Sequence, residues 1–333
     1  MESIPKMNFR DFLLSLGINP PQTFAPGQWQ RCSTVTHPRK KNASIKLVET
    51  GEVGFAQDFA SMAEPCIWRQ QNGAVVKPLD QAEIRSRIAA KKRELVECTK
   101  AAREFYAHKC TPLLHGHPYL DAKGLDMSGC HGLKQDARGD LVVPMRLNGS
   151  LISLQRITPS GTKLFWSGAT TNGTSYVIER KQATITLVCE GLATGLTLWN
   201  AVPNARVIVA FNAGNLVRAV IHHDISGLCA VCADNDHETQ QRIGKNPGVD
   251  GATLAADAIG CDIVIPECVS GTDFDDWRQE LLASERQQNL FRKWKLTDNQ
   301  MRSNALATIK ACISARLKFI RTEHPVYDSL IAA

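Results

Sequence analysis

The sequence predicts an α/β protein whose main sheet is parallel and lies between residues 184 and 285. Short apolar segments typical of buried strands alternate there with longer segments of helical periodicity. The predicted strands are TITLVCE (184–190), RVIVAF (206–211), GLCAVCAD (227–234) and CDIVIPE (261–267). A helix-like segment follows each of them, so the strands are expected to run in the same direction and to end at one common edge.

Residues 1–78 are expected to form a small separate domain. The segment NFRDFLLSLGI (8–18) predicts a short helix that ends near Gly17. From Pro20 to Pro78 the sequence is mixed and poor in predicted strands.

Residues 79–110 predict one long connector helix, because Ile84, Ile88, Leu95 and Phe105 recur at helical spacing among many basic residues. Residues 111–183 consist of short apolar runs broken by Asn-Gly and Ser-Gly, which predicts antiparallel hairpins in a basic α+β subdomain. Residues 286–333 predict a helical, basic C-terminal tail.

Composition indicates a folded cytoplasmic protein. The 333 residues are 43% apolar, enough for a substantial core. No apolar stretch approaches the roughly 20 residues of a membrane span, and MESIPKMNFRDF lacks the apolar core of a secretion signal. The eleven cysteines show no framework spacing, so we expect reduced thiols.

The net charge of +6 is unevenly divided along the chain. Residues 186–285 hold five Lys and Arg against fourteen Asp and Glu, a net charge of −9, and all other residues together carry +15. This division indicates that the acidic segment binds metal ions and that the basic segments on either side bind a polyanion. The alternative is that these charges belong to ordinary solvated surface.

Acidic residues follow three of the predicted strands. Glu190 ends the first strand, Asp234 and Asp236 end the third, and DFDDW (273–277) follows the fourth. A lone Asp-x-Asp fits a polar turn equally well. Carboxylates that meet at one sheet edge repel each other unless a cation binds, and hard oxygen ligands favour Mg²⁺ or Mn²⁺.

These motifs carry a resemblance to a known family. CEG (189–191), ADND (233–236) and DFDDW (273–277) resemble the three acidic motifs of the Toprim domain. Their surroundings resemble the Toprim primases of plasmids and satellite phages over roughly residues 110–283, including HPYLDAKGL (117–125) and NPGVDGATLAADA. The resemblance implies a Toprim-type sheet with flanking helices, and a DNA primase of mobile-element replication.

The resemblance also implies roles for single residues. Glu190 would act beside the metals as acid, base or ligand, and Asp234 and Asp236 would bind Mg²⁺. Asp273 would be the third metal carboxylate, with Asp276 assisting. For Asp275 and Asp276 an equally good interpretation is capping of the following helix, and the family more often has Asn at the place of Asp275.

Three basic residues of the hairpin region, Arg146, Arg156 and Lys163, would face the triphosphate and the template by the same resemblance. Arginine grips phosphate with two donors and lysine acts as a point charge. The alternative is exposed strand charge. Asn215 and Asn246 are expected to shape loops near the site.

Primases of this kind commonly begin with a zinc ribbon, which needs four ligands. This chain offers Cys32, His37 and Cys66, so residues 20–77 are interpreted as a degenerate, zinc-free relative of a ribbon. A second cluster, His108, Cys110, His115 and His117, overlaps the HPYL segment that the resemblance already accounts for. We therefore expect no structural zinc.

The leading functional hypothesis is primer synthesis from ribonucleoside triphosphates on single-stranded DNA. The chain has no G-x-x-x-x-G-K-[ST] loop, so any helicase must be a separate protein. Two alternatives stay open: a Toprim nuclease that uses the same metals, and a catalytically vestigial protein that binds DNA or recruits a partner. Membrane association is not expected.

Overall fold

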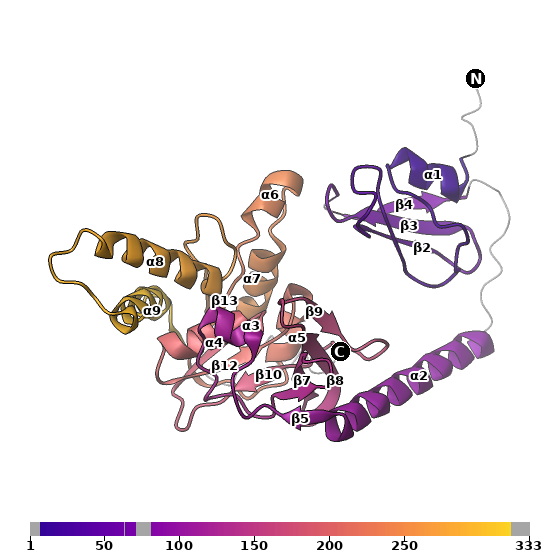
Figure 1. Cartoon of the computed structure of the whole chain (residues 1–333). Helices are drawn as coiled ribbons and strands as arrows, with labels where there is room; N and C mark the ends of the chain where they lie inside the picture. Colours follow the sequence, from indigo (N-terminus) through magenta and orange to yellow (C-terminus); the bar gives the residue numbers. More distant parts are fainter. Residues whose placement is uncertain (1–6, 63, 71–80, 321–333) are drawn as a thin grey trace. The chain divides into compact units, whose positions relative to one another are not determined.

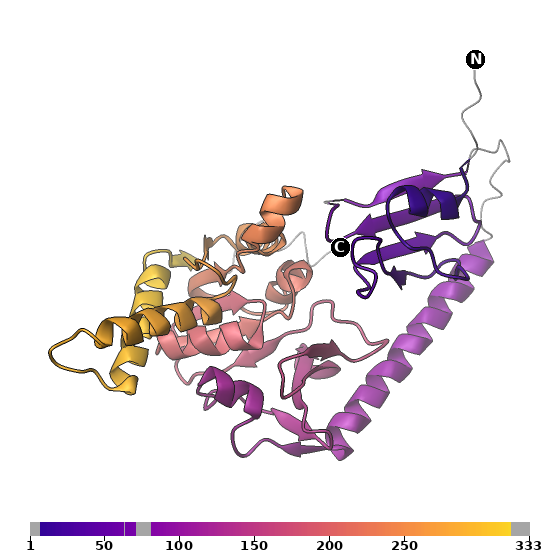
Figure 2. The same cartoon turned by 45° about the horizontal axis from the view of Figure 1, so that its top comes forward.

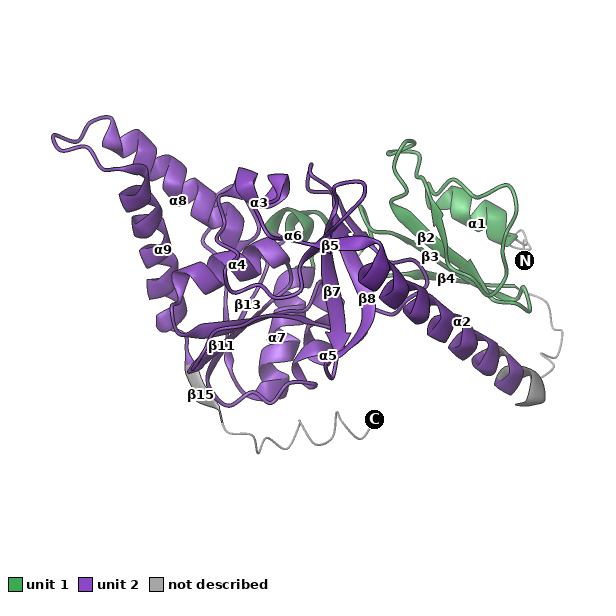
Figure 3. Ribbon diagram, turned by 60° about the horizontal axis from the view of Figure 1, so that its bottom comes forward, with its two compact units in different colours: residues 1–80, 237–246 green, residues 81–236, 247–333 purple. Residues whose placement is uncertain are grey.

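Figure 1 shows the computed structural model of the chain, which describes residues 7–62, 64–70 and 81–320. The chain divides into two compact units, one of residues 1–80 and 237–246 and the other of residues 81–236 and 247–333 (Figure 3). The predicted boundary at residues 78–79 and residues 321–333 of the predicted tail lie outside the described residues.

The first unit contains a four-stranded antiparallel sheet and two short helices. Its elements are α1 (Phe9–Ser15), β1 (Gln30–Cys32), β2 (Ala43–Leu47), β3 (Val53–Asp58), β4 (Cys66–Arg69) and, from the distant segment, α6 (His237–Ile243). The strands follow the order β1-β2-β3-β4. The predicted helix is present with Asn8 as its N-cap, but the expectation of few strands was wrong. Strands of only three to six residues leave a weak sequence signal.

Residues 81–165 form the next part of the second unit. Its elements are α2 (Gln81–His108), β5 (Cys110–Pro112), α3 (Pro118–Lys123), β6 (Lys134–Asp136), β7 (Leu141–Leu147), β8 (Ser150–Ile157) and β9 (Lys163–Phe165). The strands form the predicted antiparallel sheet, in the order β5-β6-β7-β8-β9. Asn148 and Gly149 turn β7 into β8 with φ of 47° and 76°, the left-handed geometry that a two-residue hairpin requires.

The long helix α2 is unbroken and mostly exposed (Figure 2). Its C-terminal part packs, through Ala102, Phe105 and Tyr106, against the antiparallel sheet. Arg103 Nε fixes this end by donating to Leu151 O at 2.7 Å.

The main sheet has six strands in the order β10-β12-β11-β13-β14, with β15 also paired to β13. The strands are β10 (Tyr176–Ile178), β11 (Ile185–Cys189), β12 (Ala205–Val209), β13 (Gly227–Cys232), β14 (Asp262–Val264) and β15 (Lys318–Ile320). The four strands predicted from the sequence are present and mutually parallel.

Two antiparallel strands that the sequence analysis did not predict complete this sheet beside the four predicted parallel strands. β10 pairs with β12 at one edge, and β15 pairs with Gly227, Leu228 and Cys229 of β13. The tail is therefore not wholly helical. Because β14 covers only the later part of β13, the earlier part needs another backbone partner, and β15 supplies it.

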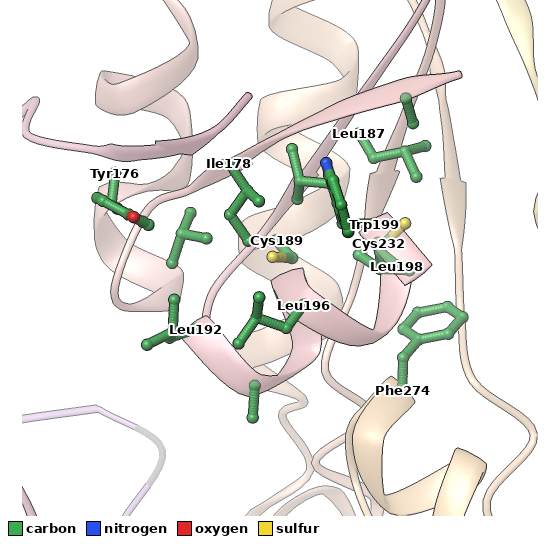
Figure 4. Close-up of a cluster of buried hydrophobic side chains, with 14 of the residues drawn as sticks. Tyr176, Ile178, Leu187, Cys189, Leu192, Leu196, Leu198, Trp199, Cys232 and Phe274 are labelled. Atoms are coloured by element: carbon green, nitrogen blue, oxygen red, sulfur yellow. The ribbon is translucent and has the colours of Figure 1, made fainter. Parts of the chain in front are cut away.

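Helices cover both faces of the main sheet. They are α4 (Leu192–Ala201), the 3₁₀ turn η1 (Ala213–Asn215), α5 (Leu216–Val220), α7 (Pro247–Ile259), α8 (Phe274–Asn289) and α9 (Asp298–Ser314). Alternate strand residues such as Leu187 and Cys189 pack in one core with α4, α8 and α9. Figure 4 shows the part of this core formed with α4 and with Phe274 of α8. Val188 lies in the core on the other face, with α5 and α7. Strands buried on both faces account for their continuous apolar sequence.

All eleven cysteines carry free thiols. Among the helices of the described residues, none is both long enough and apolar enough to cross a membrane.

Candidate metal centre

Acidic side chains gather where the parallel strands end. Glu190 follows directly after β11, and Asp234 and Asp236 come just after β13, its neighbour in the sheet. Asp273 lies beyond β14 and begins α8 as its N-cap. Parallel pairing thus brings together residues more than 80 positions apart in the chain.

The pKa shifts of these side chains show that they lie close to one another. Burial first, and then the neighbouring carboxylates, including Asp236 and Asp273, raise the pKa of Glu190 to about 7 and that of Asp234 to about 9. The positive charge of Lys163 lowers the pKa of both groups. Burial and then Asp276 raise the pKa of Asp273. Four carboxylates and one lysine therefore share one site.

Two oxygens of this cluster lack a partner in the chain. Glu190 Oε1 and Asp234 Oδ1 are buried and accept no hydrogen bond from the described residues. Leaving such atoms unpaired is costly, and a divalent cation would satisfy both. Over residues 7–62, 64–70 and 81–320, however, no three carboxylate, thiol or imidazole groups already enclose a metal position. The donor set fits Mg²⁺ or Mn²⁺, but the side chains would have to close around the ion.

Helix α7 approaches this site closely because glycines face it. A Cβ atom on Gly248 would overlap the backbone oxygen of Asp234, and one on Gly251 would lie 2.8 Å from Ala213 O. The Gly248 N–H donates to Asp236 Oδ2 at 3.0 Å. Pro247 is the first residue of α7, and Gly248 allows the first helical turn to contact the acidic segment.

Asp273 and Asp276 cap the start of α8 reciprocally. Asp273 Oδ1 accepts from the N–H groups of Asp275 and Asp276 at 2.7 and 2.9 Å, and Asp276 Oδ2 accepts from Thr272 N at 3.0 Å. The N-cap is therefore Asp273, and Asp276 occupies the first turn. This arrangement fixes the Asp273 carboxylate at the sheet edge.

Asp275 belongs to a separate ion-pair network. It is fully buried, forms an ion pair with Lys123 of α3, and accepts two bonds from the guanidinium of Arg278 at 2.7 and 3.1 Å. Thr197 Oγ1 of α4 and Gln279 Nε2 donate to the same carboxylate. These partners saturate its oxygens and join three helices, which is a structural role.

Lys163 lies on the exposed strand β9, next to the acidic cluster. Its Nζ is 3.6 Å from the place where a Cβ on Gly191 would lie, next to Glu190. Phe165 of the same strand contacts Phe211 edge-on, with ring centroids 6.5 Å apart. Phe211 has a φ of 73°, unusual for a bulky residue, and its N–H donates to Glu190 O at 2.7 Å.

The two predicted arginines lie elsewhere on the antiparallel sheet. The side chain of Arg146 on β7 donates to Gly149 O at 3.0 Å. Arg156 on β8 pairs with Asp136 and Asp140 at 3.7 and 3.9 Å. Neither arginine is among the groups with the largest effects on the pKa values of Glu190, Asp234 and Asp273.

Both predicted asparagines hold loops. Buried Asn215 donates to Thr174 O and Ala210 O at 2.8 Å and accepts from Gly173 N at 2.7 Å. Asn246 is also buried and donates to Gln240 at 3.3 Å.

The candidate zinc ligands are separated in space. Cys32 lies on β1, inside the apolar core, and Cys66 lies on β4, so three strand spacings, about 14 Å, divide them. His37 is exposed and contacts Thr36. In the second cluster, His117 is buried, caps α3 and bonds Gly139 O at 2.8 Å, which explains it structurally.

The geometry agrees with a match to a known family: residues 185–284 fit the model of the Toprim domain. The matched range begins with β11 and ends within α8, so it contains Glu190, Asp234, Asp236 and Asp273.

Two Escherichia coli proteins named DNA primase TraC are similar to this chain. The first is 27% identical over 213 residues, which cover 60% of this chain and 20% of the relative. The second is 27% identical over 198 residues, or 56% and 14% of the two chains. The chain thus spans a fifth or less of these relatives. With the Toprim match, they confirm the predicted resemblance to plasmid-type Toprim primases.

Two solved structures share a weaker likeness at 13% identity and a TM-score of 0.35. One is the bacteriophage T7 lagging-strand DNA polymerase with primase domains of two gp4 subunits, matched over 53% of this chain and 92% of that chain. The other is the DnaG primase catalytic domain bound to single-stranded DNA, matched over 68% and 94%. Neither similarity is close enough to assign a function.

Sequence reasoning missed three residues around the site. Lys123 neutralises Asp275, Phe211 forms part of the wall beside Glu190, and Gly248 permits the contact between α7 and Asp234. Only Gly248 left a signal, since glycine in the first turn of a predicted helix indicates close backbone approach.

Proposed function

We propose that this chain is a DNA primase that makes short primers on single-stranded DNA by metal-dependent nucleotidyl transfer. The observation that carries the proposal is the convergence of four carboxylates and Lys163 at one edge of the Toprim domain, with two buried carboxylate oxygens unpartnered. The similarity to two proteins named DNA primase TraC supports this choice of reaction.

The carboxylates would have different roles because their environments differ. Asp234, Asp236 and Asp273 would hold Mg²⁺ or Mn²⁺, with Glu190 as a further ligand or as the proton acceptor. A raised pKa near 7 suits Glu190 for taking a proton from an attacking hydroxyl. A bound divalent ion supplies charge stabilisation for the transferred phosphoryl group. Asp276 assists by holding Asp273 in place through the reciprocal cap.

The basic residues would bind the polyanions. Lys163 would neutralise the triphosphate, and its attraction to Glu190 and Asp234, which lowers the pKa of both, supports this role. Arg146 and Arg156 would contact the template backbone farther along the antiparallel sheet. Arg156 is held at 3.7 Å or more from its two acidic partners, a loose pairing that leaves its charge available for a phosphate.

The N-terminal sheet would contact the template as a zinc-free relative of a zinc ribbon. Trp29 is exposed with Lys46 Nζ 5.9 Å from its ring centroid, and Arg31 lies 4.9 Å over Phe59. A cavity of about 600 Å³ is lined in part by Arg31, Lys40 and Phe59, and the two cations give its wall positive charge. Aromatic faces next to cations suit single-stranded DNA.

The substrates would be ribonucleoside triphosphates, with a separate replicative helicase opening the duplex in the cytoplasm. The rival functions are metal-dependent cleavage of phosphodiesters and DNA binding without chemistry. The acidic cluster would serve a nuclease equally well, and the similarity to two proteins named DNA primase TraC favours nucleotide addition.

Synthesis on random single-stranded templates tests the proposal. Purified protein with Mg²⁺ and ribonucleoside triphosphates should yield short oligoribonucleotides, and Asp234→Asn should abolish them. Nucleotide-independent cleavage of the template would identify a nuclease instead. DNA binding without either product, in Mg²⁺ and in Mn²⁺, would identify a vestigial site.

A further inference from the structure

The turn between α8 and α9, residues 290–297, exposes its largest apolar side chains. Leu290 is 71% exposed, Phe291 86% and Trp294 80%. Figures 1 and 3 show this α8–α9 turn at the end of the helix pair away from the main sheet. Two exposed aromatic rings within four residues are unusual on a surface that has no partner.

Hydrogen bonds hold this turn in one conformation. The side chain of Asn289 bridges it, donating to Leu296 O at 3.0 Å and accepting from Leu296 N at 2.8 Å. Lys295 Nζ donates to Asn289 O and Leu290 O at 2.9 and 2.6 Å. Thr297 then starts α9 through a capping box with Gln300. The exposure of Phe291 is therefore built into a defined turn.

The helices do not need these side chains for their own packing. α8 buries Trp277 and Leu282, and α9 buries Met301 and Ile309, all on the inward faces of the pair. The α8–α9 turn lies one length of α8, about 24 Å, from the metal centre at Asp273. Its apolar side chains therefore serve neither the core nor the catalytic site.

Charge indicates what binds there. From residue 286 to residue 318 the chain has eight Lys and Arg and a single Asp. Within the turn, Arg292 pairs with Glu285 at 3.0 Å, while Lys293 Nζ lies 5.9 Å from the ring centroid of Trp294. Protein interfaces are depleted of lysine, whereas aromatic rings among cations suit bases and phosphates.

We propose that the α8–α9 turn is a second contact for single-stranded nucleic acid, outside the metal centre. Bases stack on Phe291 and Trp294, and Lys293 contacts the phosphate backbone. The choice of nucleic acid over protein rests in part on the proposed primase function. The turn thereby holds the strand at a distance from the site of synthesis.

The test is equilibrium binding of a fluorescent single-stranded oligonucleotide to the full chain, without nucleotides and with EDTA. Phe291→Ala and Trp294→Ala should each weaken binding about tenfold, since stacking on one aromatic side chain supplies that much affinity. Lys293→Ala should lower the slope of log affinity against log salt by about 0.7. Leu290→Ala is the matched control: it is equally exposed but has no ring, and its affinity should stay within twofold.

Three results would overturn the proposal. Unchanged affinity in both aromatic variants would remove the stacking contact. An equal loss in Leu290→Ala would indicate general apolar adhesion. A change in self-association by sedimentation, with nucleic acid affinity unchanged, would assign the turn to protein docking. Because no nucleotide or metal is present, these results are independent of whether the protein synthesises primers. Thermal melting of each variant checks the fold, which exposed side chains should not affect.

Discussion

Replacing Asp234 by Asn should stabilise the metal-free protein while it abolishes synthesis. A carboxyl group whose pKa is higher in the folded state costs stability above its unfolded pKa of about 4, and the cost grows with pH until the folded pKa is reached. Asp234 has a folded pKa of about 9, so the cost is present at pH 7 and still increasing there. Asparagine does not ionise, so the substitution removes this cost in folding free energy.

The size of the effect follows from the shift. At pH 7 the solution is about 3 pH units above the unfolded pKa, which corresponds to an upper limit of about 4 kcal/mol. Glu190 and Asp273 carry part of the same repulsion, so we expect a gain of about 2 kcal/mol from Asp234→Asn. The gain should be close to zero at pH 4 and larger at pH 8 than at pH 6.

Urea unfolding in EDTA at several pH values measures this gain. Asp257→Asn, an exposed position on α7, is the control and should change stability by only a few tenths of a kcal/mol. Addition of Mg²⁺ should stabilise the wild type more than Asp234→Asn, because an ion that binds only the folded state adds its binding free energy. A variant that is no more stable than the wild type at pH 7 would refute the close approach of the carboxylates.

Four further predictions test the surroundings of the site. Asp275→Ala should lower the free energy of unfolding by about 3 kcal/mol, since it leaves two cations without their buried carboxylate; a loss below 1 kcal/mol in urea unfolding would contradict the network. Gly248→Ala should cost about 2 kcal/mol and reduce synthesis, because its Cβ overlaps backbone, whereas a Cβ on Gly214 would meet Asn212 Oδ1 at an ordinary contact distance of 3.5 Å, so Gly214→Ala should change neither. Lys163→Ala should reduce primer synthesis on the order of 10²-fold while affinity for single-stranded DNA is kept, and Lys163→Arg should restore only part; full activity would make it a solvated lysine. Metal analysis should find well under one zinc per chain, and stoichiometric zinc that is lost in Cys32→Ser would overturn this expectation.

The sequence by itself determined the main sheet and the place of its acidic residues. The apolar segments at 184–190, 206–211, 227–234 and 261–267 became β11, β12, β13 and β14 because hydrophobic periodicity is a local property of the chain. Alternation with helices then fixed the parallel direction and the common edge. The acidic motifs followed from that edge, without knowledge of any contact.

Long-range pairing, in contrast, was decided only by the tertiary structure. The sequence DFDDW alone does not predict that Asp273 caps α8 while Asp275 pairs with Lys123. The role of Asp275 depends on α3, a helix that lies about 150 residues earlier in the chain. The antiparallel strand β15 exists because part of β13 lacks a neighbour, which no local pattern records. The exposure of Phe291 and Trp294 is of the same kind: their sequence fits a buried helix as well as a surface turn, and only the packing of α8 on α9 leaves them in solvent.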